Sequence, residues 1–114
     1  MCRALRAGEE WNITHNDIRP STIRIESKTA ILKLADFCLN EAGIIRDKIT
    51  PSRLPYTSPE SLYLTATDHY HRQCTPPSDI FSLGVTLHEA MTQKPAFSAD
   101  VEAEDAEKEI RYRI

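Results

Sequence analysis

The sequence predicts a small, mainly α-helical domain that contains one β-hairpin. Three stretches carry this prediction: a run rich in Ala, Leu, Arg and Glu at residues 2–10, two β-rich runs around a polar turn at residues 23–34, and a broadly apolar run at residues 80–90. The chain has 114 residues, of which 40% are hydrophobic and 27% are charged, as expected of one globular domain.

The first elements follow from local composition. A helix is expected over residues 2–10, because helix-favouring residues fill this stretch and the composition changes at Trp11. A hairpin is expected next, because apolar and branched residues flank the turn Glu26-Ser27-Lys28-Thr29 on both sides. Between residues 36 and 60 the periodicity fades and prolines appear, which is typical of a long functional loop.

A long helix is expected over about residues 78–92. Ser78 and Asp79 supply N-cap chemistry at its start, and Pro95 follows its end. Its broad apolar coverage predicts that the helix is buried. Residues 98–114 form an acidic segment, for which we expect a solvated helix; an acidic docking tail is the alternative.

Charge and cysteine content exclude several classes of partner. The net charge is −3 and the Lys and Arg residues are scattered, so a nucleic-acid surface is not expected. No run approaches the ~20 apolar residues that span a bilayer, so no membrane segment is expected. The three cysteines are odd in number and widely spaced, which suits a reducing compartment. These features predict a cytoplasmic protein.

Three short motifs occur in a fixed order. They are His15-Asn16-Asp17 followed by Thr22, then Asp36-Phe37-Cys38, and then Ser58-Pro59-Glu60. Their order and spacing resemble those of the protein kinase family, Ser/Thr type, in which His-Arg-Asp-x-x-x-x-Asn, Asp-Phe-Gly and Ala-Pro-Glu each have a separate task in phosphoryl transfer. The resemblance covers roughly residues 5–97.

The resemblance implies a truncated protein-kinase-like C-lobe, the lower half of a kinase domain. It places the catalytic loop at residues 15–22, the activation segment at residues 36–60 and the central helix at about residues 78–92. The Gly-rich loop, the lysine and the helix glutamate of the upper lobe have no counterpart in residues 1–114. The stretch from Glu89 to Phe97 is similar to the equivalent part of NIMA-related kinases.

The resemblance assigns catalytic roles to two residues of the loop. Asp17 holds the place of the catalytic base, whose carboxylate accepts a hydrogen bond from the substrate hydroxyl. Arg19 replaces the family's lysine and keeps a positive charge beside the transferred phosphate, with a different donor geometry.

Three further residues are implied in cofactor binding. The family uses Mg-ATP, and Asp36 keeps the place of one magnesium ligand. Thr22 replaces the asparagine that coordinates the other ion, which weakens that metal position. Arg24 stands where the family offers a leucine-like side chain to adenine, so it either fills the nucleotide pocket or turns aside to a carboxylate. These departures argue against Mg-ATP binding by this chain.

Other matched positions are structural in the family. His15 and Phe37 belong to its internal spine, Asp79 anchors the backbone of the catalytic loop, and Glu60 pairs with a later arginine. The group His69, His71 and Cys74 is ligand-capable but lacks a fourth ligand at zinc spacing, so an exposed polar loop is favoured there.

Three departures affect the activation segment. Cys38 replaces a glycine, which restricts the backbone; a redox-sensing cysteine is the less favoured alternative. Arg53 occupies the place of a threonine and is expected to pair with Asp17 and block substrate. Asn16 replaces the arginine that would bind a phosphorylated activation loop, so phosphorylation at Thr50, Ser52, Tyr56 or Thr57 is expected to change the conformation little.

Three functions remain open from the sequence. The preferred one is a catalytically impaired pseudokinase fragment that acts by protein binding or scaffolding. The second is an ATP-dependent protein serine/threonine kinase whose upper lobe lies outside this chain, for which Asp17, Arg19 and Asp36 speak. The third is a truncated product without function. A protein partner or substrate is expected, as is association through an apolar core face left exposed.

Overall fold

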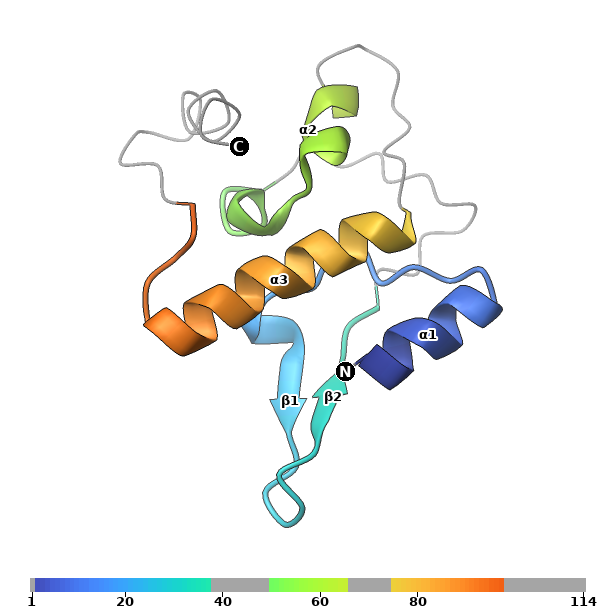
Figure 1. Cartoon of the computed structure of the whole chain (residues 1–114), viewed down its shortest axis with the longest axis vertical. Coiled ribbons are helices and arrows are strands. Elements are labelled where there is room, and N and C mark those ends of the chain that lie inside the picture. The colour runs from blue at the N-terminus through green and yellow to red at the C-terminus, as the bar shows by residue number, and fades with distance from the viewer. Residues whose placement is uncertain (1, 38–49, 66–74, 98–114) are drawn as a thin grey trace.

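The computed structural model describes residues 2–37, 50–65 and 75–97 (Figure 1). Within these residues, three α-helices and one antiparallel hairpin make up most of the regular structure, so the expected fold class, mainly α-helical with a small hairpin, is confirmed. In chain order the elements are α1 (Cys2–Glu10), the 3₁₀ turn η1 (Pro20–Thr22), β1 (Ile23–Ile25), β2 (Leu32–Leu34), the 3₁₀ turn η3 (Leu54–Tyr56), α2 (Pro59–Thr65) and α3 (Pro76–Thr92).

Helix α3 is the element around which the others are arranged. Figure 1 shows it crossing the middle of the molecule, with the hairpin projecting from one side and α2 lying on the other. Helix α3 contacts both α1 and η3. The buried apolar side chains come from the loops as well as from the helices, and they are Ile18, Leu54, Leu62, Leu83 and Val85.

Helix α1 ends in a left-handed turn that directs the chain toward α3. Asn12 has φ 55°, a conformation that Asn tolerates better than most residues. The N–H of Asn12 donates to the carbonyl of Glu9 over 3.0 Å, and the N–H of Ile13 donates to that of Gly8 over 2.7 Å. This pair of bonds is the Schellman arrangement, and it satisfies carbonyls that the end of a helix leaves unpaired.

The hairpin pairs Ile23 with Leu34 and Ile25 with Leu32, and it places Arg24 opposite Lys33. Like charges in directly opposite positions destabilise a sheet. Each cation has its own carboxylate, however, since Lys33 Nζ lies 3.1 Å from Glu26 and Arg24 lies near Asp36. The strands are shorter than the sequence predicted, because Ala30 and Ile31 belong to the turn.

The start of α3 differs from the expected one. The N-cap residue is Thr75, followed by two prolines at the first helical positions, so the helix begins at residue 76 rather than about 78. Proline suits these positions because its missing N–H would have no helical partner there. Ser78 and Asp79 therefore lie in the first turn of the helix and are not its N-cap.

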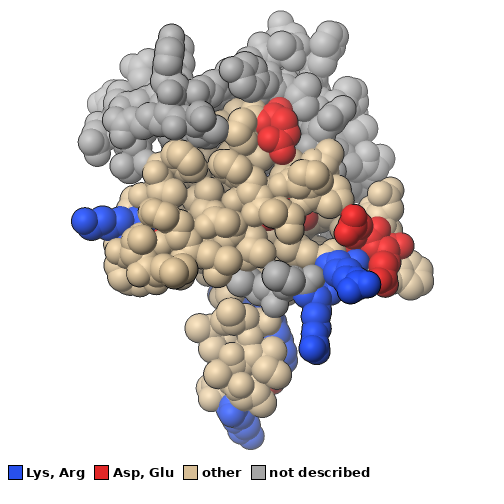
Figure 2. Space-filling model, in the orientation of Figure 1, with Lys and Arg blue, Asp and Glu red and all other residues tan. Residues whose placement is uncertain are grey.

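Helix α3 is buried on one side only, whereas the sequence predicted a buried helix. Leu83 and Val85 are buried, but Ile80, Leu87 and Met91 are 57%, 43% and 84% exposed. Figure 2 shows that the face along α3 turned to the viewer carries few charged side chains. Part of the apolar coverage of this helix therefore faces away from the core of the described residues.

Several expectations lie outside the described residues. They concern Cys38, the group at residues 69–74 and the acidic segment at residues 98–114. In the part of the chain that is described, no helix combines the length and the hydropathy needed to span a bilayer. Within the same residues, no three His, Cys, Asp or Glu side chains are grouped as metal ligands would be.

Two glycines give a matched test of the α1 terminus. A Cβ added at Gly8 would lie 2.7 Å from the carbonyl oxygen of Ile13, whereas one added at Gly84 would meet nothing within 4 Å. We expect Gly8→Ala to displace Ile13 and break its bond, a loss of about 1 kcal/mol that offsets the gain in helix propensity, so that the free energy of unfolding does not rise. Gly84→Ala, in the interior of α3, should raise it by about 1 kcal/mol.

Urea titration of both variants measures these changes. Equal effects of the two alanines would contradict the close approach of Ile13 to Gly8.

Candidate functional site

The carboxylate of Asp79 holds the loop that begins at His15. Asp79 is 4% exposed and lies in the first turn of α3, where the helix dipole favours a negative charge. Its Oδ2 accepts the N–H of His15 over 2.7 Å, and its Oδ1 accepts the N–H of Asn16 over 2.8 Å. Asn16 has φ 65°, which turns the chain so that both N–H groups point to one carboxylate.

The ring of His15 is fully buried and links the loop to the residues after β2. Its Nε2 lies 2.9 Å from the carbonyl of Ala35, and its Nδ1 lies 3.3 Å from the N–H of Asp17. A carbonyl needs a donor and an N–H needs an acceptor, so these contacts select the neutral ring with its proton on Nε2. The ring centroid also lies 4.4 Å from that of Phe37. His15 and Phe37 thus form one internal contact.

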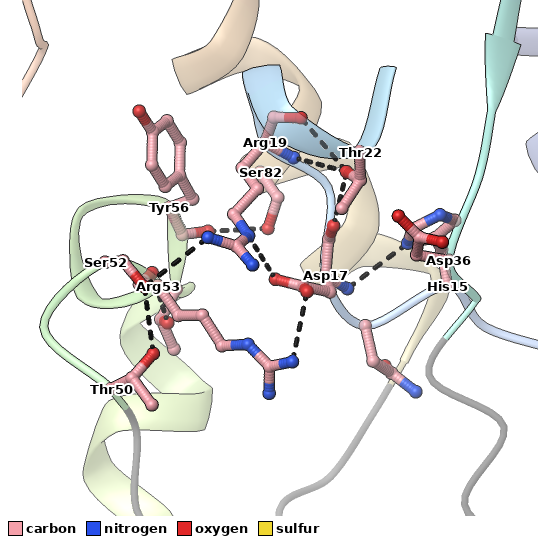
Figure 3. A network of polar contacts seen from close by, with 12 residues as sticks. His15, Asp17, Arg19, Thr22, Asp36, Thr50, Ser52, Arg53, Tyr56 and Ser82 are labelled. Carbon is pink, nitrogen blue, oxygen red and sulfur yellow. Dashed lines mark hydrogen bonds and ion pairs between the residues drawn. The ribbon is translucent and has the colours of Figure 1, made fainter. Parts of the chain in front are cut away.

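Asp17 is clamped between two arginines (Figure 3). Its side chain is 7% exposed; Oδ1 lies 3.0 Å from Arg19 Nε, and Oδ2 lies 3.1 Å from Arg53 Nη2. The ion pair expected of Arg53 is therefore present. Each carboxylate oxygen of Asp17 faces a guanidinium. The oxygen that would accept the proton of a substrate hydroxyl is therefore already paired with an arginine. We call Asp17, Arg19 and Arg53 the arginine clamp.

The space beside the arginine clamp is small. A cavity of about 30 Å³ lies between Asp17, Arg53, Tyr56 and Ser82. Such a volume holds about one or two water molecules. Arg53 and Asp17 both line this cavity.

The hydroxyl of Thr22 is committed to the loop backbone. Thr22 is 2% exposed, and its Oγ1 lies 2.7 Å from the carbonyl of Asp17 and 3.0 Å from that of Arg19. The same oxygen accepts the N–H of Arg19 over 3.1 Å. Thr22 therefore closes the turn η1 from inside.

Arg24 turns aside to a carboxylate, one of the two outcomes that the sequence left open. Its Nη2 lies 3.6 Å from Asp36 Oδ2, and both side chains are 64% exposed. An exposed pair of this length is weak. Asp36 has φ 59°, a left-handed conformation that Asp adopts more readily than most residues. The arrangement places a positive charge beside the carboxylate that the resemblance assigns to magnesium.

The donor set does not fit a magnesium ion bound as in the family. Magnesium needs oxygen ligands in near-octahedral geometry. The hydroxyl of Thr22 is buried and hydrogen-bonded within its own loop, and the carboxylate of Asp36 faces Arg24. The hydroxyl of Thr22 is therefore not available to an ion, and the charge of Arg24 opposes a cation at Asp36.

Tyr56 joins the segment after residue 50 to α3. Its hydroxyl donates to Glu89 Oε2 over 2.6 Å, and its carbonyl accepts the hydroxyl of Ser82 over 2.6 Å. Burial raises the pKa of Tyr56 to about 12, helped by the bond to Glu89 and by the charge of Glu89, while Arg19 opposes the change. Two hydrogen bonds of Tyr56 thus join the segment after residue 50 to α3.

Glu60 also contacts α3. Its Oε1 accepts the hydroxyl of Ser78 over 2.8 Å. Burial raises the pKa of Glu60, but hydrogen bonds from its own backbone N–H, Ser78 and Ser58 outweigh this effect, so the pKa lies below its ordinary value. A serine of α3 thus contacts the carboxylate for which the resemblance implied a later arginine.

The structure brings most of the predicted site residues together. It also shows contacts of two residues that the sequence did not single out, Ser52 and Glu89. His15, Asp17, Arg19, Thr22, Arg53 and Asp79 form one connected network. Arg24 and Asp36 form a separate exposed pair. Sequence reasoning did not assign contacts to Ser52, which lies 3.4 Å from Arg19 Nη1, or to Glu89. Both partners are 33 residues away along the chain, so no local pattern points to them.

Comparisons with known proteins agree with the motifs. The family model described as "Protein kinase domain" matches residues 1–114. The protein named serine/threonine-protein kinase mos from Patiria pectinifera is 31% identical over 110 residues, which cover 88% of this chain and 29% of that protein. Serine/threonine-protein kinase PknB from Mycobacterium leprae is 28% identical over 110 residues, which cover 96% of this chain and 17% of that protein. The chain thus spans less than a third of these relatives.

The raised pKa of Tyr56 predicts a loss of stability at high pH. Between the ordinary value of 10.0 and about 12, the unfolded chain has lost this proton and the folded chain keeps it. Folding therefore binds a proton in this window, and the free energy of unfolding falls as pH rises through it. Below pH 10 the contribution is fully present.

Chemical denaturation of the wild type and of Tyr56→Phe from pH 8 to 12.5 isolates this contribution. We expect the difference in free energy of unfolding to stay constant up to about pH 10 and then to narrow. A difference that does not change with pH would show that burial and Glu89 do not raise the pKa of Tyr56.

Proposed function

Because the chain belongs to the protein kinase domain family, we propose that it is a catalytically impaired Ser/Thr-type kinase-like fragment that acts by binding another protein. The matched motifs and the relatives support the Ser/Thr type. The relatives' family uses Mg-ATP in general. For this chain, the impaired chemistry and the binding role are inferences from the site.

The arginine clamp is the observation that carries the proposal. A catalytic base must be free to accept a hydrogen bond from the substrate hydroxyl. Asp17 instead faces Arg19 over 3.0 Å and Arg53 over 3.1 Å, and Arg53 also lines the small cavity beside it. The buried Thr22 and the pair between Arg24 and Asp36 speak against a metal-bound nucleotide.

Finer assignments extend this proposal. The order of the catalytic loop, activation segment and central helix is that of the C-lobe, and residues 89–97 favour the NIMA-related branch. The cysteine pattern favours the cytoplasm. These assignments rest on the sequence.

The proposed partner is a protein that covers apolar surface. Ile80, Leu87 and Met91 are exposed on α3 at spacings of seven and four residues, so they share one face of the helix. A groove of about 620 Å³ between α1 and the start of α3, lined by Leu5, Ile13 and Ile80, continues this apolar surface. Contiguous exposed apolar surface is typical of interaction sites.

The second candidate is an active protein kinase whose remaining parts lie outside residues 1–114. Its support is that Asp17 and Asp36 keep the carboxylates of the family pattern. In that case Arg53 would have to leave Asp17 when substrate binds. A truncated product without function is the third candidate, and it predicts that the chain does not unfold cooperatively.

A thermal melt with millimolar magnesium and ATP tests the proposal. A ligand that binds only the folded state raises the midpoint, by the equivalent of about 1.4 kcal/mol when its concentration is ten times Kd. We expect a cooperative melt whose midpoint Mg-ATP leaves unchanged, since the hydroxyl of Thr22 is bonded within its own loop and Arg24 places a positive charge beside Asp36.

Magnesium with AMP and the variant Asp36→Asn are the controls. A midpoint that rises with Mg-ATP, but not with the AMP control or in Asp36→Asn, would favour the active kinase. A broad transition without cooperativity would favour the third candidate.

A further inference from the structure

We propose that a second copy of this chain covers the groove between α1 and the start of α3, and that the two α1 helices lie antiparallel across a two-fold axis. The inference rests on the proposed function in one respect, because it names the partner of the exposed apolar surface. It uses no contact of the arginine clamp.

The groove combines apolar residues with one charge of each sign on α1. Its apolar members are Leu5, Ile13, Pro76, Pro77 and Ile80. The charged members on α1 are Arg6 and Glu9, which are three residues apart and therefore lie on one face of the helix. Asp79 also lines the groove, but its carboxylate accepts two backbone N–H groups of the loop after α1. An occupant therefore meets apolar surface beside a cation and an anion.

The backbone fixes the shape of the groove before any partner binds. The N–H of Ile13 donates to the carbonyl of Gly8 over 2.7 Å, which holds Ile13 against the end of α1. On the other side, the rings of Pro76 and Pro77 restrict the backbone at the start of α3. Ile13 and Ile80 are nevertheless exposed. Because little reordering is needed, association at this surface loses less conformational entropy.

The charges along α1 oppose the dipole of the helix. Arg3 and Arg6 lie in its N-terminal half and Glu9 and Glu10 end it, while its first turn has no acidic residue and its last turn no basic one. Figure 2 shows the positive and the negative side chains of this region as two adjacent groups. A helix dipole favours anions at the N-terminus and cations at the C-terminus. The single helix therefore carries an unfavourable arrangement of charge.

An antiparallel second copy compensates this arrangement. Two antiparallel helices bring the N-terminal half of each against the C-terminal half of the other. With the axis midway between positions 6 and 9, Arg6 faces Glu9 of the second copy, and Glu9 faces Arg6 of the second copy, because contacts across a two-fold axis are reciprocal. Arg3 then lies within one turn of Glu10 of the second copy. One surface thus supplies both sets of complementary charges.

The ion pair within α1 competes little with these contacts. Arg6 Nε lies 3.9 Å from Glu10 Oε1, and both side chains are largely exposed. An exposed pair of this length contributes little to stability. Among the described residues, neither Arg3 nor Glu9 belongs to an ion pair. The charges that the second copy requires are therefore available.

The mixed charge favours a second copy over a partner of one charge sign. A strongly acidic or basic partner would attract one of Arg6 and Glu9 and repel the other. The nine residues of α1 extend over about 14 Å, so this helix alone does not bury the area of about 1,000 Å² that a stable interface needs. The apolar residues of the groove have to contribute as well. We therefore expect a weak dimer that forms at high protein concentration.

Sedimentation velocity of the full chain tests the proposal. Protein concentrations from about 1 μM to 1 mM cover the range in which weak complexes dissociate. We expect the sedimentation coefficient to rise from that of a monomer to that of a dimer and then to stay constant, because a two-fold contact closes on itself. The measurement requires no phosphotransfer activity and no nucleotide.

Two charge reversals identify the surface. Arg6→Glu and Glu9→Arg should each weaken the dimer by about tenfold or more, because like charges then face each other across the axis. An equimolar mixture of the two variants should dimerise again, since each supplies the charge that the other lacks. Lys28→Glu, in the exposed hairpin turn, changes the net charge as Arg6→Glu does and should leave the dimer unchanged. Circular dichroism checks that each variant is folded.

A chain that stays monomeric over the whole range would overturn the proposal, and association beyond a dimer would overturn the two-fold arrangement. Single variants that dimerise as the wild type does would overturn the role of Arg6 and Glu9, and a mixture that stays monomeric would overturn the antiparallel pairing. A monomeric chain whose cooperative melt is unaffected by Mg-ATP leaves the proposed function in place with a different partner, so the two failures are distinguishable.

Discussion

The carboxylate of Asp79 is the constraint on which the site depends. It is buried in the first turn of α3 and accepts two backbone N–H groups of the loop that follows α1. Hydrogen bonds to a charged acceptor contribute about 1.5–3 kcal/mol each, and a buried donor left unpaired is costly. These bonds fix His15, and the neutral ring of His15 in turn accepts the N–H of Asp17. The position of Asp17 thus follows from a helix more than 60 residues away.

Within the frame that Asp79 and His15 hold, three arginines determine the surroundings of the two carboxylates. Arg53 reaches from the segment after residue 50 to a carboxylate that the frame holds in place, and Arg19 approaches the same carboxylate from within its own loop. Arg24 meets Asp36 in a similar but exposed pair. Each pair places a cation where the family pattern needs a free carboxylate. The described residues therefore keep the order of the family motifs, while Asp17 is held by two arginines and Asp36 lies near a third.

The local sequence pattern predicted the helices and the hairpin. Contacts between distant segments determine the exposed face of α3 and the partners of the site residues. The hairpin around residues 26–29 and the helix at residues 2–10 follow from turn chemistry and composition. The predicted N-cap of α3 was wrong, because two prolines extend that helix toward Thr75. An exposed apolar face was expected, but the sequence did not say that Leu87 and Met91 lie on it, because apolar coverage does not show which side of a helix meets a neighbour. The contact between Ser52 and Arg19 joins separate segments and has no sequence signal.

The most direct test of the blocked site is a double-mutant cycle for Asp17→Asn and Arg53→Met, measured as free energies of unfolding in urea. A buried charged contact predicts a coupling of about 1–3 kcal/mol. The exposed pair of Arg24 and Asp36, treated in the same way, should give less than about 0.5 kcal/mol. A coupling near zero for Asp17 and Arg53 would show that Arg53 does not hold Asp17, and it would contradict the arginine clamp.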